Sequence, residues 1–80
     1  MTFLQLTFAV EVANSTSINK AAERLYTSQS NVSNSIKALE DELGIKIFDR
    51  TKKGSSVTEP GREFLSYARE ILDKMDFVED

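Results

Sequence analysis

Cysteine and histidine are both missing from this 80-residue sequence. The lack of cysteine excludes disulfides and thiolate metal sites. The lack of histidine removes the commonest general base and the commonest metal ligand. Serine and carboxylate side chains are present, but the groups that usually activate them are not. We therefore expect no catalytic residues, no metal site and a protein that is not an enzyme.

Long hydrophobic runs are also missing, because no apolar stretch approaches the ~18 residues of a transmembrane helix. The apolar N-terminal stretch lacks the basic segment with which a signal peptide begins, and Glu11 interrupts it. It is therefore interpreted as a folded helix and not as a signal peptide. We expect a cytoplasmic protein with no membrane partner, and the length fits one small domain.

Basic residues are fewer than acidic ones over the whole chain, 10 against 13, which gives a net formal charge of −3. The acidic residues gather at the C-terminal end: residues 58–80 hold three basic and seven acidic residues, whereas residues 17–57 hold seven basic and five acidic ones. Association with a polyanion depends on the local field more than on the total charge. The mildly basic middle segment therefore remains compatible with nucleic-acid binding.

Four segments have apolar residues at helical spacing, at about residues 3–13, 17–25, 28–43 and 59–80. Cap-forming residues precede three of them: Ser17, Thr27 or Ser28, and Thr58. Gly44 stands where a left-handed C-cap residue ends the third helix. Between the third and fourth helices, β-branched residues flank the turn cluster KKGSS. This pattern predicts a short two-stranded hairpin that includes Ile45, Ile47 and Val57, with Lys52, Lys53 and Gly54 at its tip.

The second and third helices are joined by a tight turn. Ala21 and Ala22 are small enough to let two helices cross closely, which is the layout of a helix-turn-helix. With the hairpin as a wing, we predict a mainly α fold: a winged helix-turn-helix domain over residues 1–58 and a long linker and dimerisation helix over residues 59–80. The predicted core is Phe3, Leu6, Val10, Ile18, Ala22, Leu25, Val32, Ile36, Leu39, Leu43, Ile47, Phe48 and Val57.

The third helix has small polar residues in its first turns, although serine and asparagine are mediocre helix formers. Short side chains that donate and accept hydrogen bonds suit a helix in the DNA major groove. Their simplest structural interpretation is capping and solvation. For DNA contact we predict base-facing Gln29, Ser30, Asn31, Ser33 and Asn34, backbone-contacting Ser17, Asn19, Thr27, Ser28 and Lys37, and wing residues Arg50, Lys52 and Lys53.

The last helix has an apolar seam with alternating steps of four and three residues, which is typical of self-association. We expect its first half to pack on its own domain and its second half to meet a partner chain. The first helix also has an apolar stripe, formed by Leu4, Phe8 and Val12, that we expect to face outward toward the partner's last helix. The predicted dimer interface is Leu4, Phe8, Ile71, Met75 and Val78.

The stretch AAERLYTSQSNVSNSIKALEDELGIKIFDRTKKGSSVTEPGREFL resembles the DNA-binding domain and linker helix of LysR-type transcriptional regulators. The resemblance covers almost the whole chain. It implies a homodimer that reads dyad-symmetric promoter sites on double-stranded DNA. It also implies a small-molecule coinducer that binds a separate C-terminal domain, so we expect no cofactor in this chain and a longer regulator. Ser30 and Asn34 depart from the proline and arginine that many members have there, so the resemblance carries the family's DNA contacts more directly to Gln29, Ser33 and Arg50 than to Ser30, Asn31 and Asn34.

An alternative function is a winged-helix protein-interaction module with a coiled-coil tail and no DNA binding. The negative net charge favours this alternative, whereas the face of small polar residues on the third helix and the basic wing oppose it. Salt dependence separates the two, because each neutralised phosphate adds a log–log slope of about −0.9 to DNA affinity.

Overall fold

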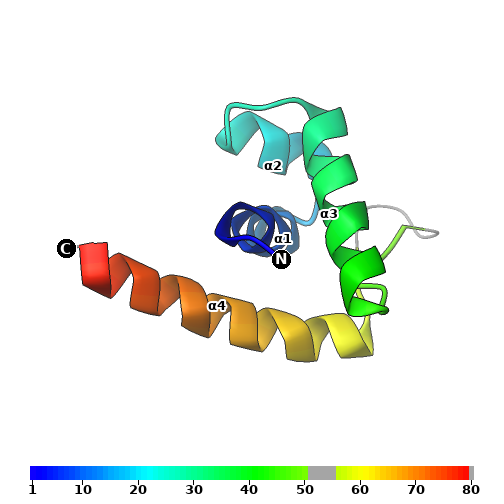
Figure 1. Cartoon of the computed structure of the whole chain (residues 1–80). Coiled ribbons are helices and arrows are strands. Elements are labelled where there is room, and N and C mark those ends of the chain that lie inside the picture. Colours follow the sequence, from blue (N-terminus) through cyan, green and yellow to red (C-terminus); the bar gives the residue numbers. More distant parts are fainter. Residues whose placement is uncertain (51–55, 80) are drawn as a thin grey trace.

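The computed structural model describes residues 1–50 and 56–79, with side chains in the second range described as far as Met75. Four helices form the body of the molecule, and a small hairpin lies at one edge beside α3 (Figure 1). In chain order the elements are α1 (Phe3–Ser15), α2 (Ile18–Arg24), α3 (Gln29–Leu43), β1 (Phe48–Asp49), β2 (Ser56–Val57) and α4 (Glu59–Glu79).

The predicted cap residues end and begin the helices as expected. The hydroxyl of Ser17 accepts from the Lys20 N–H at 3.3 Å, and that of Ser28 accepts from the Asn31 N–H at 3.0 Å. Gly44 closes α3 with φ of 72°, a left-handed conformation that glycine adopts without steric cost. Thr2 and Gln5 add a capping box at α1 that the sequence patterns did not predict.

Helix α1 lies in the middle of the molecule and contacts α2, α3 and α4 (Figure 1). Because it is covered from several sides, Phe8 and Val12 are buried in the core of their own chain, with exposed fractions of 4% and 0%. The prediction that they form an outward stripe with Leu4, and that Phe8 lies in a dimer interface, is therefore wrong. Leu4 alone of the three is exposed, at 60%.

The rest of the predicted core is confirmed with one exception. Phe3 is the first residue of α1, and its side chain is 51% exposed. The core also includes Leu65 and Ala68 of α4. The other predicted members are all buried or packed against this core: Leu6, Val10, Ile18, Ala22, Leu25, Val32, Ile36, Leu39, Leu43, Ile47, Phe48 and Val57.

The hairpin is antiparallel, with Phe48 opposite Val57 and Asp49 opposite Ser56. The first strand begins at Phe48 and not at Ile45 as predicted. The Ile47 N–H donates to the Glu40 carboxylate of α3 and not to a second strand. The predicted wing-tip residues Lys52, Lys53 and Gly54 lie outside the described residues. The observed elements form the predicted winged helix-turn-helix.

Helix α4 runs beneath α1 and continues past it (Figure 1). Leu65 and Ala68 are buried, which confirms that its first half packs on its own domain. Farther along, Ile71 is 37% exposed and Met75 is half-buried. The side chain of Val78, the last predicted dimer contact, lies outside the described residues.

Candidate nucleic-acid interface

The turn between α2 and α3 sets the position of the third helix. Ala21 and Ala22 are buried at the crossing, and Leu25 packs against the core. Tyr26 reverses the chain with φ of 55°, and the next N–H, of Thr27, donates to the Ala22 carbonyl at 3.1 Å. This tight turn leaves the first turns of α3 at the surface of the molecule.

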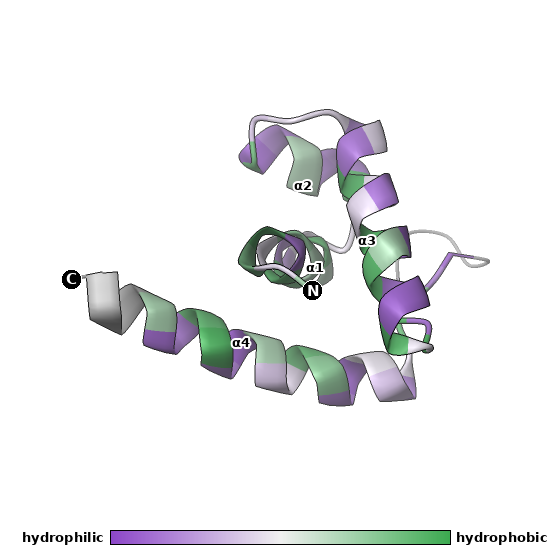
Figure 2. Ribbon diagram, in the orientation of Figure 1, coloured by the Kyte–Doolittle hydropathy of each residue, from purple (hydrophilic) through white to green (hydrophobic). Residues whose placement is uncertain are grey.

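The two faces of α3 differ sharply in character. Val32, Ile36 and Leu39 have exposed fractions of 0% and anchor the helix in the core. The opposite face begins with hydrophilic residues, as the colours in Figure 2 show. The structure places most of the predicted base-facing side chains there: Gln29, Ser30, Asn31 and Asn34 are exposed, and Ser33 is half-buried.

The predicted backbone-contacting residues surround this face. Ser17 and Ser28 are N-cap residues of α2 and α3, so these two predicted phosphate contacts lie at helix N-termini, where free N–H groups favour anions. The Asn31 side-chain amide donates to the Thr27 hydroxyl at 2.8 Å, which orients it. Its carbonyl oxygen and second N–H are the pair that can bind adenine in a bidentate manner. Asn19 and Lys37 are exposed.

The base of the wing is tied directly to the third helix. The Arg50 guanidinium donates from Nη1 to the Ser33 hydroxyl at 2.9 Å, joining two residues that are 17 positions apart. A guanidinium has five N–H groups, so this bond leaves Arg50 able to bind a phosphate as well. Beside it lies a groove of about 420 Å³ whose lining includes Lys37, Lys46 and Arg50. The lining also includes the acidic residues Glu40 and Asp49, so basic and acidic side chains both border the groove on the wing side of α3.

Glu40 has a role that the sequence patterns missed. Glu40 is an acidic residue, yet its exposed fraction is only 5%. Its Oε2 accepts from the backbone N–H groups of Ile47 at 2.7 Å and Phe48 at 3.3 Å. Its position four residues after buried Ile36, on the same helix face, was the available signal.

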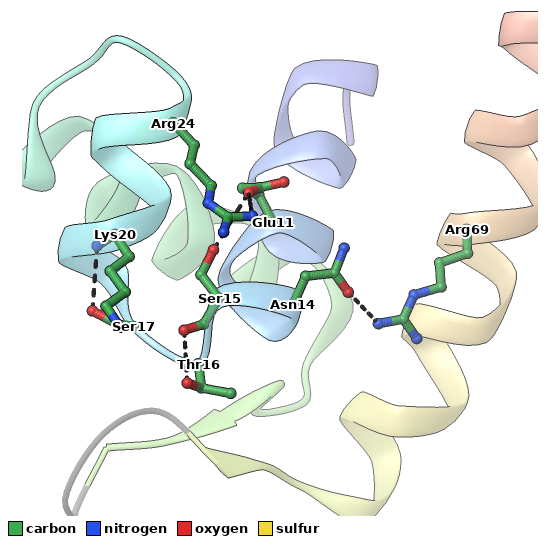
Figure 3. Close-up of polar contacts among 8 residues, drawn as sticks. All are labelled: Glu11, Asn14, Ser15, Thr16, Ser17, Lys20, Arg24 and Arg69. Carbon is green, nitrogen blue, oxygen red and sulfur yellow. Dashed lines mark hydrogen bonds and ion pairs between the residues drawn. The ribbon is translucent and has the colours of Figure 1, made fainter.

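Polar contacts fix α1 to the helices on either side of it (Figure 3). The Arg24 guanidinium of α2 binds the Glu11 carboxylate at 3.3 Å. On the other side, Arg69 of α4 donates to the Asn14 side-chain oxygen at 3.1 Å. These contacts join the helix-turn-helix and the last helix through one central element.

The described residues contain no group of three or more metal-binding side chains. In the same part of the chain, no helix is long and apolar enough to cross a membrane.

Comparisons with known proteins give one consistent result. A family model described as bacterial regulatory helix-turn-helix protein, lysR family, matches residues 3–62. The regulator CysB of Haemophilus influenzae is 44% identical over 72 residues, covering 88% of this chain and 22% of CysB. The regulator cbl of Klebsiella aerogenes is 46% identical over 80 residues, covering 98% of this chain and 25% of cbl.

Solved structures agree with the sequence relatives. The crystal structure of the BenM DBD/catB site 1 DNA complex has a TM-score of 0.94 and 33% identity, covering 98% of this chain and 88% of that one. That of the CbnR DBD–DNA complex has a TM-score of 0.94 and 35% identity, covering 100% and 92%. This chain spans about a quarter of the length of the CysB and cbl regulators. It belongs to the LysR family of bacterial regulatory helix-turn-helix proteins.

Proposed function

We propose that this chain is the DNA-binding part of a homodimeric LysR-type transcriptional regulator and reads a dyad-symmetric site on double-stranded DNA. The observation that carries this proposal is the exposed polar face on the first turns of α3, which the tight turn at Tyr26 presents at the surface. The BenM and CbnR relatives, solved as DNA complexes, support it.

In this proposal the exposed face of α3 enters the major groove. Gln29, Ser30, Asn31, Ser33 and Asn34 contact base edges, since short amides and hydroxyls match the donor and acceptor pattern there. The flanking phosphates are bound by residues at or near the helix N-termini and by basic side chains close to the wing. These are Ser17, Asn19, Thr27, Ser28 and Lys37, with Arg50, Lys52 and Lys53 in the wing.

The dimer forms through the last helix in this proposal. Residues 1–58 act as the DNA-reading domain and residues 59–80 as the linker, where the partly exposed Ile71, together with Met75 and Val78, meets the partner copy. Leu4 lies on the exposed first turn of α1 and joins this interface. The regulator is cytoplasmic and is not an enzyme, and its small-molecule coinducer binds a separate C-terminal domain.

Selection from randomised duplex DNA tests the function. We expect the purified chain to enrich a dyad-symmetric site and to lose affinity for it steeply with salt, by a log–log slope of about −0.9 per neutralised phosphate. Asn31→Ala should relax specificity at defined base pairs, costing about 1–3 kcal/mol of discrimination there. Ser66→Ala, at an exposed position on α4, is the matched control. A folded, dimeric chain that enriches no site would refute DNA reading and favour the protein-interaction module.

A further inference from the structure

A compact joint connects the DNA-reading helix α3 to the dimer helix α4. It consists of Glu40 of α3, Ile47 before β1, and Thr58 and Gly61 at the start of α4. Ile47 has an exposed fraction of 0% and is the point at which the other three residues converge. Both helices are therefore connected through the backbone of one residue.

Hydrogen bonds hold this joint from two sides. On the side of α3, the Glu40 carboxylate accepts the Ile47 N–H at 2.7 Å. On the side of α4, the Thr58 N–H donates to the Ile47 carbonyl at 3.0 Å. The Thr58 hydroxyl donates to the Lys46 carbonyl and accepts the Gly61 N–H at 3.0 Å. The peptide groups around residue 47 are thus bonded to both helices.

Gly61 brings the first turn of α4 into direct contact with this backbone. A Cβ placed on Gly61 would lie 2.3 Å from the Ile47 carbonyl oxygen and 2.8 Å from its Cα. Both distances are far below van der Waals contact, and the obstructing atoms are backbone that cannot rotate away. Only glycine permits this approach, so the contact fixes how α4 leaves the domain.

In a dimer paired through α4, a small change in the direction of this helix produces a large change in the position of α3. A helix of 21 residues is about 30 Å long at ~1.5 Å per residue. A tilt of roughly 10° at the joint moves its far end by about 5 Å, which exceeds the ~3.4 Å between successive base pairs. In a dimer paired through α4, a small change in this angle would move each reading helix by more than one base pair relative to the dyad.

We propose that Glu40, Thr58 and Gly61 are positioning residues that set the half-site spacing which the dimer selects. They touch no base in this proposal, and act by fixing the angle between α3 and α4. The inference rests on the proposed function, because half-site spacing has meaning only for a dimer that reads DNA through α3.

The test measures affinity for a series of duplexes in which two half-sites are separated by spacers that grow one base pair at a time. A duplex with a single half-site is measured in parallel. The unaltered chain should prefer one spacing. Gly61→Ala and Thr58→Val should shift the preferred spacing by at least one base pair, or reduce the preference over neighbouring spacings at least threefold. Their single half-site affinity should stay within twofold of the unaltered chain.

Thr58→Ser is the matched control, because it keeps the hydroxyl and should keep the original spacing. Thr58→Val has nearly the shape of threonine, so it carries the test on its own if Gly61→Ala does not fold. Folded variants with the unaltered spacing preference would overturn the proposal. Failure of the proposed function would look different, because the unaltered chain itself would then show no duplex affinity or no preferred spacing.

Discussion

The buried carboxylate of Glu40 offers the sharpest test of how the wing is held on α3. Glu40→Ala removes the acceptor of two backbone N–H groups, those of Ile47 and Phe48, while both residues stay buried. A buried donor left unsatisfied costs about 1–3 kcal/mol. The bond to Ile47 at 2.7 Å is short, whereas that to Phe48 at 3.3 Å is long and should contribute less.

These terms give a loss of about 3 kcal/mol for Glu40→Ala, out of the roughly 4–12 kcal/mol expected for a domain of this length. For such a domain each kcal/mol shifts the melting temperature by about 4–8 °C, so the variant should melt about 12–24 °C lower. Thermal and urea denaturation followed by circular dichroism measure this shift. The melting temperature of Glu40→Gln should lie between those of the unaltered chain and Glu40→Ala, because the glutamine amide keeps one acceptor oxygen.

Asp41→Ala is the matched control, since this neighbouring acid of α3 is exposed. Substitution at such a surface position should change the free energy of unfolding by less than ~0.5 kcal/mol. If Glu40→Ala lowered the free energy of unfolding no more than Asp41→Ala does, the carboxylate would not be holding the strand. Glu40 would then also not stabilise the joint between α3 and α4.

Two further predictions concern the turn and the wing. Tyr26→Gly should stabilise the domain by roughly 0.5–1 kcal/mol in urea denaturation, because Tyr26 has φ of 55° and a side chain that is 96% exposed; a loss of stability would show that the ring makes a contact that matters. Ser33→Ala and Arg50→Ala, combined in a double-mutant cycle on DNA affinity, should be non-additive by about 0.5–1.5 kcal/mol because the two side chains are bonded at 2.9 Å. Strict additivity would mean that wing and helix act independently.

Much of the DNA-reading unit could be predicted from local signals. Ser28 as cap, apolar residues at steps of three and four, and Gly44 at the end define α3 within one residue of its observed bounds. These features depend on contacts between residues close in the chain, so the sequence pattern contains them directly. The same pattern separates the polar face that includes Asn31 and Asn34 from the buried face.

The predictions that failed depended on knowing how many other elements pack around a helix. The spacing of Leu4, Phe8 and Val12 correctly shows one apolar stripe of α1, but it does not show that α4 covers the helix on another side. Phe8 and Val12 belong to the core, whereas Phe3, predicted to be buried, is 51% exposed. Periodicity identifies a face of a helix and does not identify what lies against it.

By itself, then, the sequence determined the helices, their caps, the helix-turn-helix and the polar face of α3, because each arises from residues within a few positions of one another. The tertiary structure decided which acidic residue is buried, that Arg50 bonds to Ser33, and that Gly61 contacts the Ile47 backbone. Those features join residues 7 to 17 positions apart. Their side-chain types are compatible with many partners, and the packing of α1, α3 and α4 selects one.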